Sequence, residues 1–231
     1  QAGPVELHAD PQQMTLPATT TASLQWSTLA VPPTLDYKIT LSDGTEVRLN
    51  SQTTLRFPLG FQGPKREVYV QGQAWFKVSK DKLHPFIVHT PGTEVLVVGT
   101  QFDVNTYEEK EETALVEGAV ILKHGSTEVA IKPGIMSVYT PGRGFSTSPF
   151  DPTELLSWMK GVYYFHNTPL KDLAKLITRW YNVEVQFMNP GLQGKTFSGQ
   201  IVKGQPLQSF LDNLNLSEDM HGSLRDGKII F

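Results

Sequence analysis

Six histidines are the residues of this chain that could hold a metal ion or move a proton near neutral pH. Zinc sites in proteins use three or four ligands at defined spacing, and no two of these histidines stand three or four positions apart on a predicted helix. His84 and His89 flank Pro85-Phe86 and would approach each other only across a bent strand. Surface or loop positions are the simpler interpretation, so we expect no metal site and no cofactor at His8, His84, His89, His124, His166 and His221.

Three carboxylates, Asp43, Asp103 and Glu117, could be imagined as an acid–base pair for glycoside cleavage. Asp43 precedes Gly44 and is more simply a turn residue, and the other two are more simply charges on strand faces. The chain has no cysteine, no nucleophile elbow and no phosphate-binding loop. We therefore expect a protein that is not an enzyme.

Over the first two thirds of the chain, the sequence pattern around these residues predicts strands. Between Tyr37 and Tyr139, short alternating patterns are separated by turn signals, at the rhythm of a sandwich, a barrel or a solenoid. Asp43-Gly44 predicts a hairpin between Tyr37–Leu41 and Glu46–Leu49. No helical stripe occurs there, so we predict an all-β domain.

A β–α pattern occurs twice in the last seventy-odd residues. Each copy has a proline followed by apolar residues at i, i+3, i+4 and i+7, the stripe of a helix that packs on a sheet. The stripes are Leu170, Leu173, Ala174 and Ile177 in the first copy, and Leu207, Phe210, Leu211 and Leu214 in the second. They predict β-α-β followed by β-α-β-β, with two helices on one small sheet in a two-layer unit.

Local signals set the ends of these elements. Asn167 or Thr168 is expected to cap the first helix, with Pro169 in its first turn. Asn182 is expected to end that helix in a left-handed conformation, and Asp226-Gly227 predicts a final hairpin.

The fold class is therefore α+β. We expect a linker or tether over residues 1–23, an all-β domain over 24–145, a linker over 146–157 and a small α/β domain over 158–231. A short helical turn is expected near Thr153–Met159.

Net charge and apolar runs limit the partners. The formal net charge of −3 gives no electrostatic case for binding nucleic acid or an anionic membrane. No stretch approaches the roughly 20 apolar residues that cross a bilayer. Because the chain begins at Gln1 rather than at Met, we expect a trimmed fragment whose membrane segment lay upstream.

Several motifs in order resemble the FecR family of anti-sigma regulators. They are Leu41-Ser42-Asp43-Gly44-Thr45, Val68-x-Val70-x-Gly72-Gln73-Ala74, Pro85-Phe86-x-Val88, Gly99-Thr100-x-Phe102-x-Val104 and Leu115-Val116-Glu117-Gly118. The resemblance continues through Trp158, Gly161, Phe165, Asn167, Pro169-Leu170 and Trp180-Tyr181, which are similar to the short N-terminal signalling domain of secretins and TonB-dependent receptors.

This resemblance implies a transmembrane relay. The periplasmic part would bind the signalling domain of a TonB-dependent outer-membrane receptor. A helix would cross the inner membrane, and a cytoplasmic segment would hold an extracytoplasmic-function (ECF) sigma factor. Because this sequence lacks the helix and the cytoplasmic segment, we expect it to be the periplasmic sensing portion of a single-pass inner-membrane protein.

The resemblance also marks Gly99-Thr100 as a candidate for self-cleavage, since some family members cut themselves within a Gly-Thr pair. The Thr100 hydroxyl would attack the Gly99 carbonyl, and water would open the resulting ester. The simpler interpretation is that Gly99 permits a bulge or a tight bend.

The aromatic pair Trp180-Tyr181 has two interpretations. Trp180 continues the Leu173/Ile177 stripe and is expected in the core, whereas Tyr181 could be either exposed or structural.

Partner binding is expected along an exposed strand edge of the C-terminal domain, because backbone hydrogen bonds give affinity without a side-chain code. The candidate edge residues are Phe197, Ser198, Gly199, Gln200 and Ile201, together with Lys228, Ile229 and Ile230. The alternatives are a carbohydrate-binding module that uses Trp26, Trp75 and exposed tyrosines, and a hydrolase built on the β domain.

Overall fold

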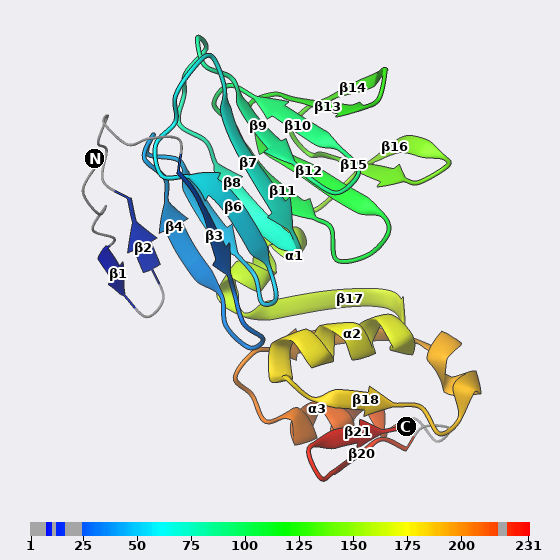
Figure 1. Cartoon of the computed structure of the whole chain (residues 1–231). Helices are drawn as coiled ribbons and strands as arrows, with labels where there is room; N and C mark the ends of the chain where they lie inside the picture. Colours follow the sequence, from blue (N-terminus) through cyan, green and yellow to red (C-terminus); the bar gives the residue numbers. More distant parts are fainter. Residues whose placement is uncertain (1–7, 11–12, 17–24, 217–220) are drawn as a thin grey trace. The chain divides into compact units, whose positions relative to one another are not determined.

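The computed structural model of the chain describes residues 8–10, 13–16, 25–216 and 221–231. It divides into two compact units (Figure 1). The first contains Asp36–Pro152 and the strands that precede it, and the second contains Thr153–Phe231 together with the short segment Pro33–Leu35.

The first unit contains a nine-stranded sheet with the order β1-β2-β4-β5-β8-β11-β12-β15-β16. Most neighbours are antiparallel, and β2 pairs parallel to β4. The strands are β1 (His8–Asp10), β2 (Gln13–Thr15), β4 (Tyr37–Thr40), β5 (Glu46–Leu49), β8 (Gln73–Lys77), β11 (Gln101–Asn105), β12 (Glu111–Glu117), β15 (Ile135–Thr140) and β16 (Gly144–Pro149).

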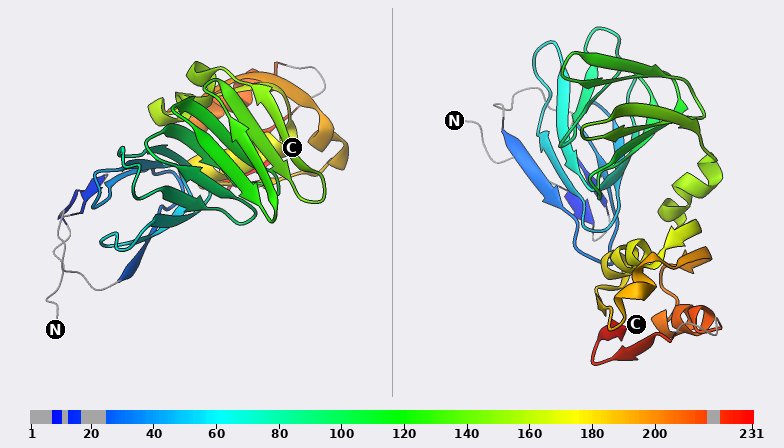
Figure 2. Two further views of the ribbon diagram at one scale, coloured as in Figure 1. Left: turned by 90° about the horizontal axis from the view of Figure 1, so that it is seen from above. Right: turned by 90° about the vertical axis from the view of Figure 1, so that its right-hand side faces the viewer.

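A seven-stranded sheet with the order β14-β13-β10-β9-β7-β6-β3 completes this unit. Its one parallel neighbour pair is β7 with β9. The strands are β3 (Trp26–Ala30), β6 (Thr54–Pro58), β7 (Arg66–Gln71), β9 (Phe86–His89), β10 (Glu94–Val97), β13 (Val120–His124) and β14 (Thr127–Ile131). Figure 2 gives two further views of the sheets.

The two sheets form a sandwich, because both contribute their alternate apolar residues to one core. Phe76 and Phe102, from the nine-stranded sheet, stack with ring centroids 5.1 Å apart, and Phe76 also meets Phe86 of the other sheet at 6.3 Å. All three side chains are fully buried. The periodicity of the sequence left a sandwich, a barrel and a solenoid open. The contacts across the core show that the domain is a sandwich.

Two segments expected to be linkers contain strands. Residues 8–10 and 13–15 form a hairpin that joins the nine-stranded sheet through β2 and β4, with Leu16 buried beside it. Residues 144–149 form the antiparallel partner of β15. The prolines and small polar residues of both segments are typical of linkers. They are compatible with strands at a sheet edge, because an edge strand forms backbone hydrogen bonds on one side only.

The second unit has the element order expected from the duplicated pattern. After α1 (Pro152–Leu155) and the 3-10 helix η1 (Leu156–Lys160) come a β-α-β segment and a β-α-β-β segment. The elements are β17 (Val162–Pro169), α2 (Leu170–Tyr181), β18 (Glu184–Gln186), the 3-10 helix η2 (Pro190–Gly194), β19 (Thr196–Val202), α3 (Leu207–Leu214), β20 (Ser223–Arg225) and β21 (Lys228–Ile230).

The prediction of a single small sheet for this unit is wrong. The described strands form two sheets, β17-β19 and β18-β21-β20, and α2 contacts strands of both (Figure 1). The reason is visible on α2, where Leu176 is buried in addition to the predicted stripe. A helix buried on so wide a face packs against two layers rather than one. Phe210 of α3 likewise meets Phe165 of β17, with centroids 6.5 Å apart.

The start of α2 differs from the prediction and its end agrees. Pro169 itself is the N-cap, and no side chain caps the helix. Asn167 has a φ of 49° and lies at a register shift between β17 and β19. Asn182 ends the helix with φ 55° and ψ 43°, as predicted.

Candidate functional site

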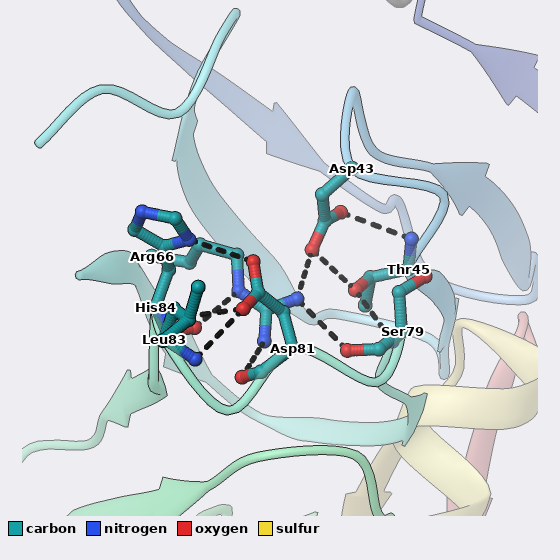
Figure 3. Close-up of polar contacts among 7 residues, drawn as sticks. All are labelled: Asp43, Thr45, Arg66, Ser79, Asp81, Leu83 and His84. Atoms are coloured by element: carbon teal, nitrogen blue, oxygen red, sulfur yellow. Dashed lines mark hydrogen bonds and ion pairs between the residues drawn. The ribbon is translucent and has the colours of Figure 1, made fainter. Parts of the chain in front are cut away.

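Asp43 is a turn residue, as predicted, but it also forms a buried ion pair (Figure 3). Its carboxylate accepts hydrogen bonds from the backbone N–H of Thr45 at 2.9 Å and from the Thr45 hydroxyl at 2.7 Å. The Arg66 Nη1 atom lies 2.7 Å from Asp43 Oδ2, and the two side chains are 5% and 13% exposed. Asp43 therefore has a structural partner for its charge.

Arg66 connects this turn to the loop that follows β8 (Figure 3). Its Nε donates to the carbonyl of His84 at 2.8 Å, and its Nη1 donates to the carbonyl of Ser79 at 3.0 Å. Asp81 then holds His84, with Oδ2 2.7 Å from Nδ1. The hydrogen bond from His84, more than any other contact, lowers the pKa of the Asp81 carboxyl. One arginine thus holds three backbone segments together.

The other two carboxylates proposed for hydrolysis lie in separate networks. Asp103 is 2% exposed and accepts from Gln73 Nε2 at 3.1 Å, while Gln73 accepts from Asn50 at 2.9 Å. Glu117 is exposed and accepts from Gln101 Nε2 at 2.6 Å. Asp103 was expected on a strand face and is on one, but its burial was not expected. The three carboxylates form no convergent acid–base pair, so the hydrolase alternative gains no support.

Gly99-Thr100 lies in the tight bend between β10 and β11. Gly99 has a φ of 148°, and a Cβ built on it would lie 2.9 Å from the Cα of Lys80. No residue other than glycine fits this backbone without a shift. The bend therefore needs Gly99 whether or not the peptide bond is ever cut.

The Thr100 hydroxyl is buried and already bonded. Thr100 is 3% exposed, and its Oγ1 donates to the carbonyl of Ala119 at 2.9 Å. Its own carbonyl accepts from the N–H of Val78 at 2.9 Å. A backbone carbonyl is a weak base, so this geometry holds the hydroxyl without activating it. Self-cleavage at Gly99-Thr100 stays an untested alternative to the structural role of Gly99.

A cleft of about 320 Å³ lies beside this bend. Its charged lining comes from a row of cross-strand neighbours, in which Glu46 opposes Lys77, Lys77 opposes Gln101 and Gln101 opposes Glu117. Lys77 Nζ lies 3.7 Å from Glu46 Oε1. A hydrogen bond from Lys38 is the main cause of the lowered pKa of Glu46. Opposite charges here neutralise each other and offer no concentrated field for an ionic ligand.

The histidines do not converge, and within the described ranges no three His, Cys, Asp or Glu side chains are placed to share a metal ion. His84 pairs with Asp81, whereas His89 stacks on Tyr69 with centroids 4.6 Å apart. His124 has its Nδ1 2.6 Å from the carbonyl of Gly92. His8 lies on β1, His166 lies 3.2 Å from Glu154, and His221 is exposed.

The carbohydrate-binding alternative needs an aromatic ring with an open face on which a sugar can stack. Tyr69 is 39% exposed, but the Arg56 guanidinium lies 5.3 Å from its ring centroid and His89 stacks on the ring. Arg56 also lies 4.8 Å from the ring centroid of Trp26. Trp75 is half-buried. Occupied ring faces give this alternative no support.

Trp180 and Tyr181 both have structural roles. Trp180 is 3% exposed, as the helical stripe predicted. The Tyr181 hydroxyl donates to the carbonyl of Val202 at 3.1 Å, and burial raises its pKa. Tyr181 therefore fastens α2 to the end of β19.

The two candidate edges differ in the structure. Lys228–Ile230 is the middle strand of its sheet, with β18 on one side and β20 on the other, so its prediction as an edge is wrong. The hairpin signal located this strand, but it could not reveal the parallel partner β18. Phe197–Ile201 lies within β19, which in the described part of the chain pairs only with β17 and is an edge strand.

The hydrogen-bond register shows which β19 groups face away from β17. Lys203 N–H donates to Gly161 and Leu170 N–H donates to Lys195, which fixes the hydrogen-bonded pairs at both ends of the ladder. Since such pairs alternate with non-bonded ones, Thr196 and Gln200 direct their N–H and C=O groups to the open side. Both are exposed.

The β17 edge is less regular. Its His166 and Asn167 lie opposite the single residue Ser198, whose Oγ accepts from the Asn167 N–H at 2.9 Å. Pro169 has no N–H to donate. A bulge and a proline make this edge a poor template for another strand, so β19 has the more regular open edge of this sheet.

Comparisons with known proteins agree with this architecture. The model of the FecR protein family matches residues 28–121, and the model of the FecR C-terminal region matches residues 162–231. Within the described residues, no helix has the length and apolar character needed to span a bilayer. No curated protein matches the chain.

Two solved structures of a candidate anti-sigma factor from Parabacteroides distasonis ATCC 8503 are similar to this one. Each has a TM-score of 0.81 and 25% sequence identity to the chain. The structure at 1.65 Å resolution covers 88% of this chain and 97% of its own. For the structure at 2.50 Å the shares are 89% and 98%. Because family models match both of its units, the chain belongs to the FecR family of anti-sigma factors, and its role is sensing and regulation.

Proposed function

We propose that this chain is the periplasmic sensing part of a single-pass inner-membrane anti-sigma factor. Its C-terminal unit binds the signalling domain of a TonB-dependent outer-membrane receptor. Occupancy is passed through an upstream helix to a cytoplasmic segment that holds an ECF sigma factor. The family implies a sigma-factor partner in general, and the receptor and the relay are the proposed steps.

The open edge of β19 is the observation that carries this proposal. Thr196 and Gln200 direct backbone groups away from β17, and most residues of the strand are exposed. A partner strand would satisfy these groups and extend the two-stranded sheet to three strands. Neither edge of the other sheet is as long, since β18 and β20 have three residues each.

Tyr181 limits where the partner strand can begin. Its hydroxyl already occupies the carbonyl of Val202, so pairing is confined to the Thr196–Gln200 part of β19. Gly199 adds no side chain on the helix-facing side, where a Cβ would lie 3.2 Å from the Phe165 ring. The partner therefore needs only a short extended segment of about three to five residues, the usual length of a short strand.

Calorimetric titration of this chain with the isolated signalling domain of the receptor tests the proposal. We expect saturable one-to-one binding, and we expect Gln200→Pro to weaken it about tenfold by removing one edge hydrogen bond and crowding the incoming strand. Because the Gln200 N–H faces away from β17, this proline breaks no bond of the β17–β19 ladder. Gln200→Val, which keeps the N–H, is the matched control and should bind as the unmodified chain does.

Absence of saturable binding at high micromolar concentration would overturn the proposed function. Binding that Gln200→Pro leaves unchanged would reject β19 as the site while leaving receptor binding intact. Circular dichroism of each variant verifies that the small unit remains folded.

A further inference from the structure

The outer face of the seven-stranded sheet contains an arginine held between aromatic rings. Arg56 on β6 is opposite Thr28 on β3 and Tyr69 on β7 in the strand register. Its guanidinium carbon lies 4.8 Å from the Trp26 ring centroid and 5.3 Å from that of Tyr69. The two rings meet edge to face, with centroids 5.5 Å apart. Such contacts hold the guanidinium plane in one orientation.

Arg56 has no carboxylate among the described residues. Its guanidinium lies over those two aromatic rings, and its side chain is exposed. Trp26 is 37% and Tyr69 is 39% exposed. A cleft of about 250 Å³ adjoins the guanidinium and is also lined by Thr54, Gln71 and Thr90. The donors of this arginine are therefore oriented and available to an acceptor from outside.

The same region has an open strand edge. Among the strands that the structure describes, β3 ends the seven-stranded sheet and pairs only with β6. Val31 N–H donates to Thr53 and Leu59 N–H donates to Gln25, which marks the bonded pairs at the two ends of the β3–β6 ladder. By alternation, Trp26, Thr28 and Ala30 direct their backbone groups to the open side. Their side chains are exposed on the face that carries Arg56.

We propose that β3 accepts an extended segment of a protein partner, and that Arg56 binds a carboxylate side chain of that segment. The added strand would lie two strand spacings from β6, about 10 Å, and Arg56 bends over Trp26 towards that side. An arginine fork matches a carboxylate in two parallel hydrogen bonds. Arginine, tryptophan and tyrosine are also the side chains that dominate binding energy at protein interfaces.

The charges nearby favour a carboxylate over a phosphate. Glu67 and Glu94 lie beside His89, at 3.8 Å and 3.5 Å from its ring nitrogens. Lys123, the next cation across the sheet, pairs with Glu128 at 2.6 Å. A single arginine with no ion pair in the described part of the chain, and with two carboxylates beside the neighbouring His89, attracts one negative charge and disfavours the dense charge of nucleic acid or phosphate.

The test is an NMR titration of the isotope-labelled chain with two blocked pentapeptides, Thr-Val-Glu-Val-Thr and Thr-Val-Gln-Val-Thr. We expect both to shift the amide signals of Thr28 and Ala30 and the indole signal of Trp26. The glutamate peptide should bind about fivefold more tightly, as one exposed charge-assisted pair allows. Inorganic phosphate is a third probe and should shift these signals no more than chloride does.

Two pairs of variants separate the arginine from the edge. Arg56→Gln should remove the preference for the glutamate peptide, and Arg56→Lys should retain part of it. Thr28→Pro should abolish binding of both peptides without breaking the β3–β6 ladder, and Thr28→Val should not. The spectra themselves show whether each variant is folded.

The proposal is overturned if neither peptide shifts the β3 signals at millimolar concentration. It is equally overturned if the two peptides bind alike, if phosphate binds more tightly than the glutamate peptide, or if the preference survives Arg56→Gln. The readouts lie on β3 rather than on β19, so this proposal and the receptor proposal can fail separately.

Discussion

The two units of the chain are stabilised by different kinds of buried residue. In the β sandwich, polar networks accompany the apolar core. One is the Asp43–Arg66 ion pair, and another is the buried Glu111 carboxylate, which accepts from Thr90 at 2.5 Å and from Thr93 at 2.9 Å. In the C-terminal unit, Ser157 is the one buried polar side chain among the described residues.

This difference indicates different tasks. Buried hydrogen-bonded charges have strict geometric requirements, so the sandwich is held in one specific arrangement. The C-terminal unit has short strands and two amphipathic helices whose apolar faces meet two small sheets. Packing of this kind tolerates small adjustments better than a charged network does. The proposed receptor binding therefore falls on the more adaptable of the two units.

The largest expected effect is in the sandwich. Arg66→Ala should lower its free energy of unfolding by about 3–5 kcal/mol, because Asp43 is left buried without its counter-charge. Urea unfolding followed by circular dichroism measures this loss. The double substitution with Asp43→Ala should cost less than the sum of the two single ones. Strict additivity would show that the pair does not act as a unit.

A comparable loss is expected in the other unit from an apolar truncation. Leu173 on α2 is completely buried, so Leu173→Ala should destabilise the C-terminal unit by about 3 kcal/mol through lost transfer energy and a cavity. Hydrogen exchange resolved by residue should show faster opening of α2 with little change in the sandwich. The control Lys171→Ala removes an exposed side chain of the same helix. Equal acceleration of exchange in both units would show that they do not unfold independently.

The pH dependence of the unfolding free energy should distinguish the two units by a smaller amount. Burial raises the pKa of Glu112 on β12. A hydrogen bond that Asn105 donates at 3.4 Å acts in the opposite direction but is the smaller effect. A raised carboxyl pKa means that the folded chain holds this proton more tightly than the unfolded chain does. The charged form therefore costs stability above the folded pKa, and that cost disappears as the pH falls towards the unfolded value near 4.5.

Glu112→Gln should accordingly stabilise the sandwich at pH 7, and the gain should shrink as the pH is lowered. Thermal melts at several pH values measure it, with Glu109→Gln as a control for removing a charge at an exposed position. A gain that grows on acidification would have the wrong sign for a buried carboxyl.

The smallest expected change concerns Gly99-Thr100. Because the Thr100 hydroxyl is buried and donates to Ala119, we expect intact-mass spectrometry to show one uncut species of 25.7 kDa after long incubation. Two fragments that join at Gly99 and Thr100 would show that this peptide bond is reactive although the Thr100 hydroxyl is already bonded.

Local patterns predicted the features that depend on neighbouring residues. The α2 stripe, the Asn182 stop and the hairpins at Asp43-Gly44 and Asp226-Gly227 were all predicted correctly, since each is decided within a few positions. The motifs also predicted the FecR family, which the matches over residues 28–121 and 162–231 confirm.

Features that join distant residues were not predictable from one sequence. Arg66 and Asp43 are 23 positions apart, and nothing in the local pattern pairs them. Because β18 pairs in parallel with β21, the C-terminal strands form two sheets, and Lys228–Ile230 is the central strand of the second. The cation–π contact of Arg56 with Trp26 depends on the β3–β6 register. Long-range register is a tertiary property, and periodicity does not report it.

Hydrogen exchange of the chain with and without the receptor's signalling domain would detect strand addition at β19. We expect the amides of Thr196 and Gln200 on β19 to become protected, because a partner strand takes up their hydrogen-bonding groups. Lys228–Ile230, already paired on both sides, should show little change. Saturable binding that leaves β19 unprotected would contradict strand addition at this edge.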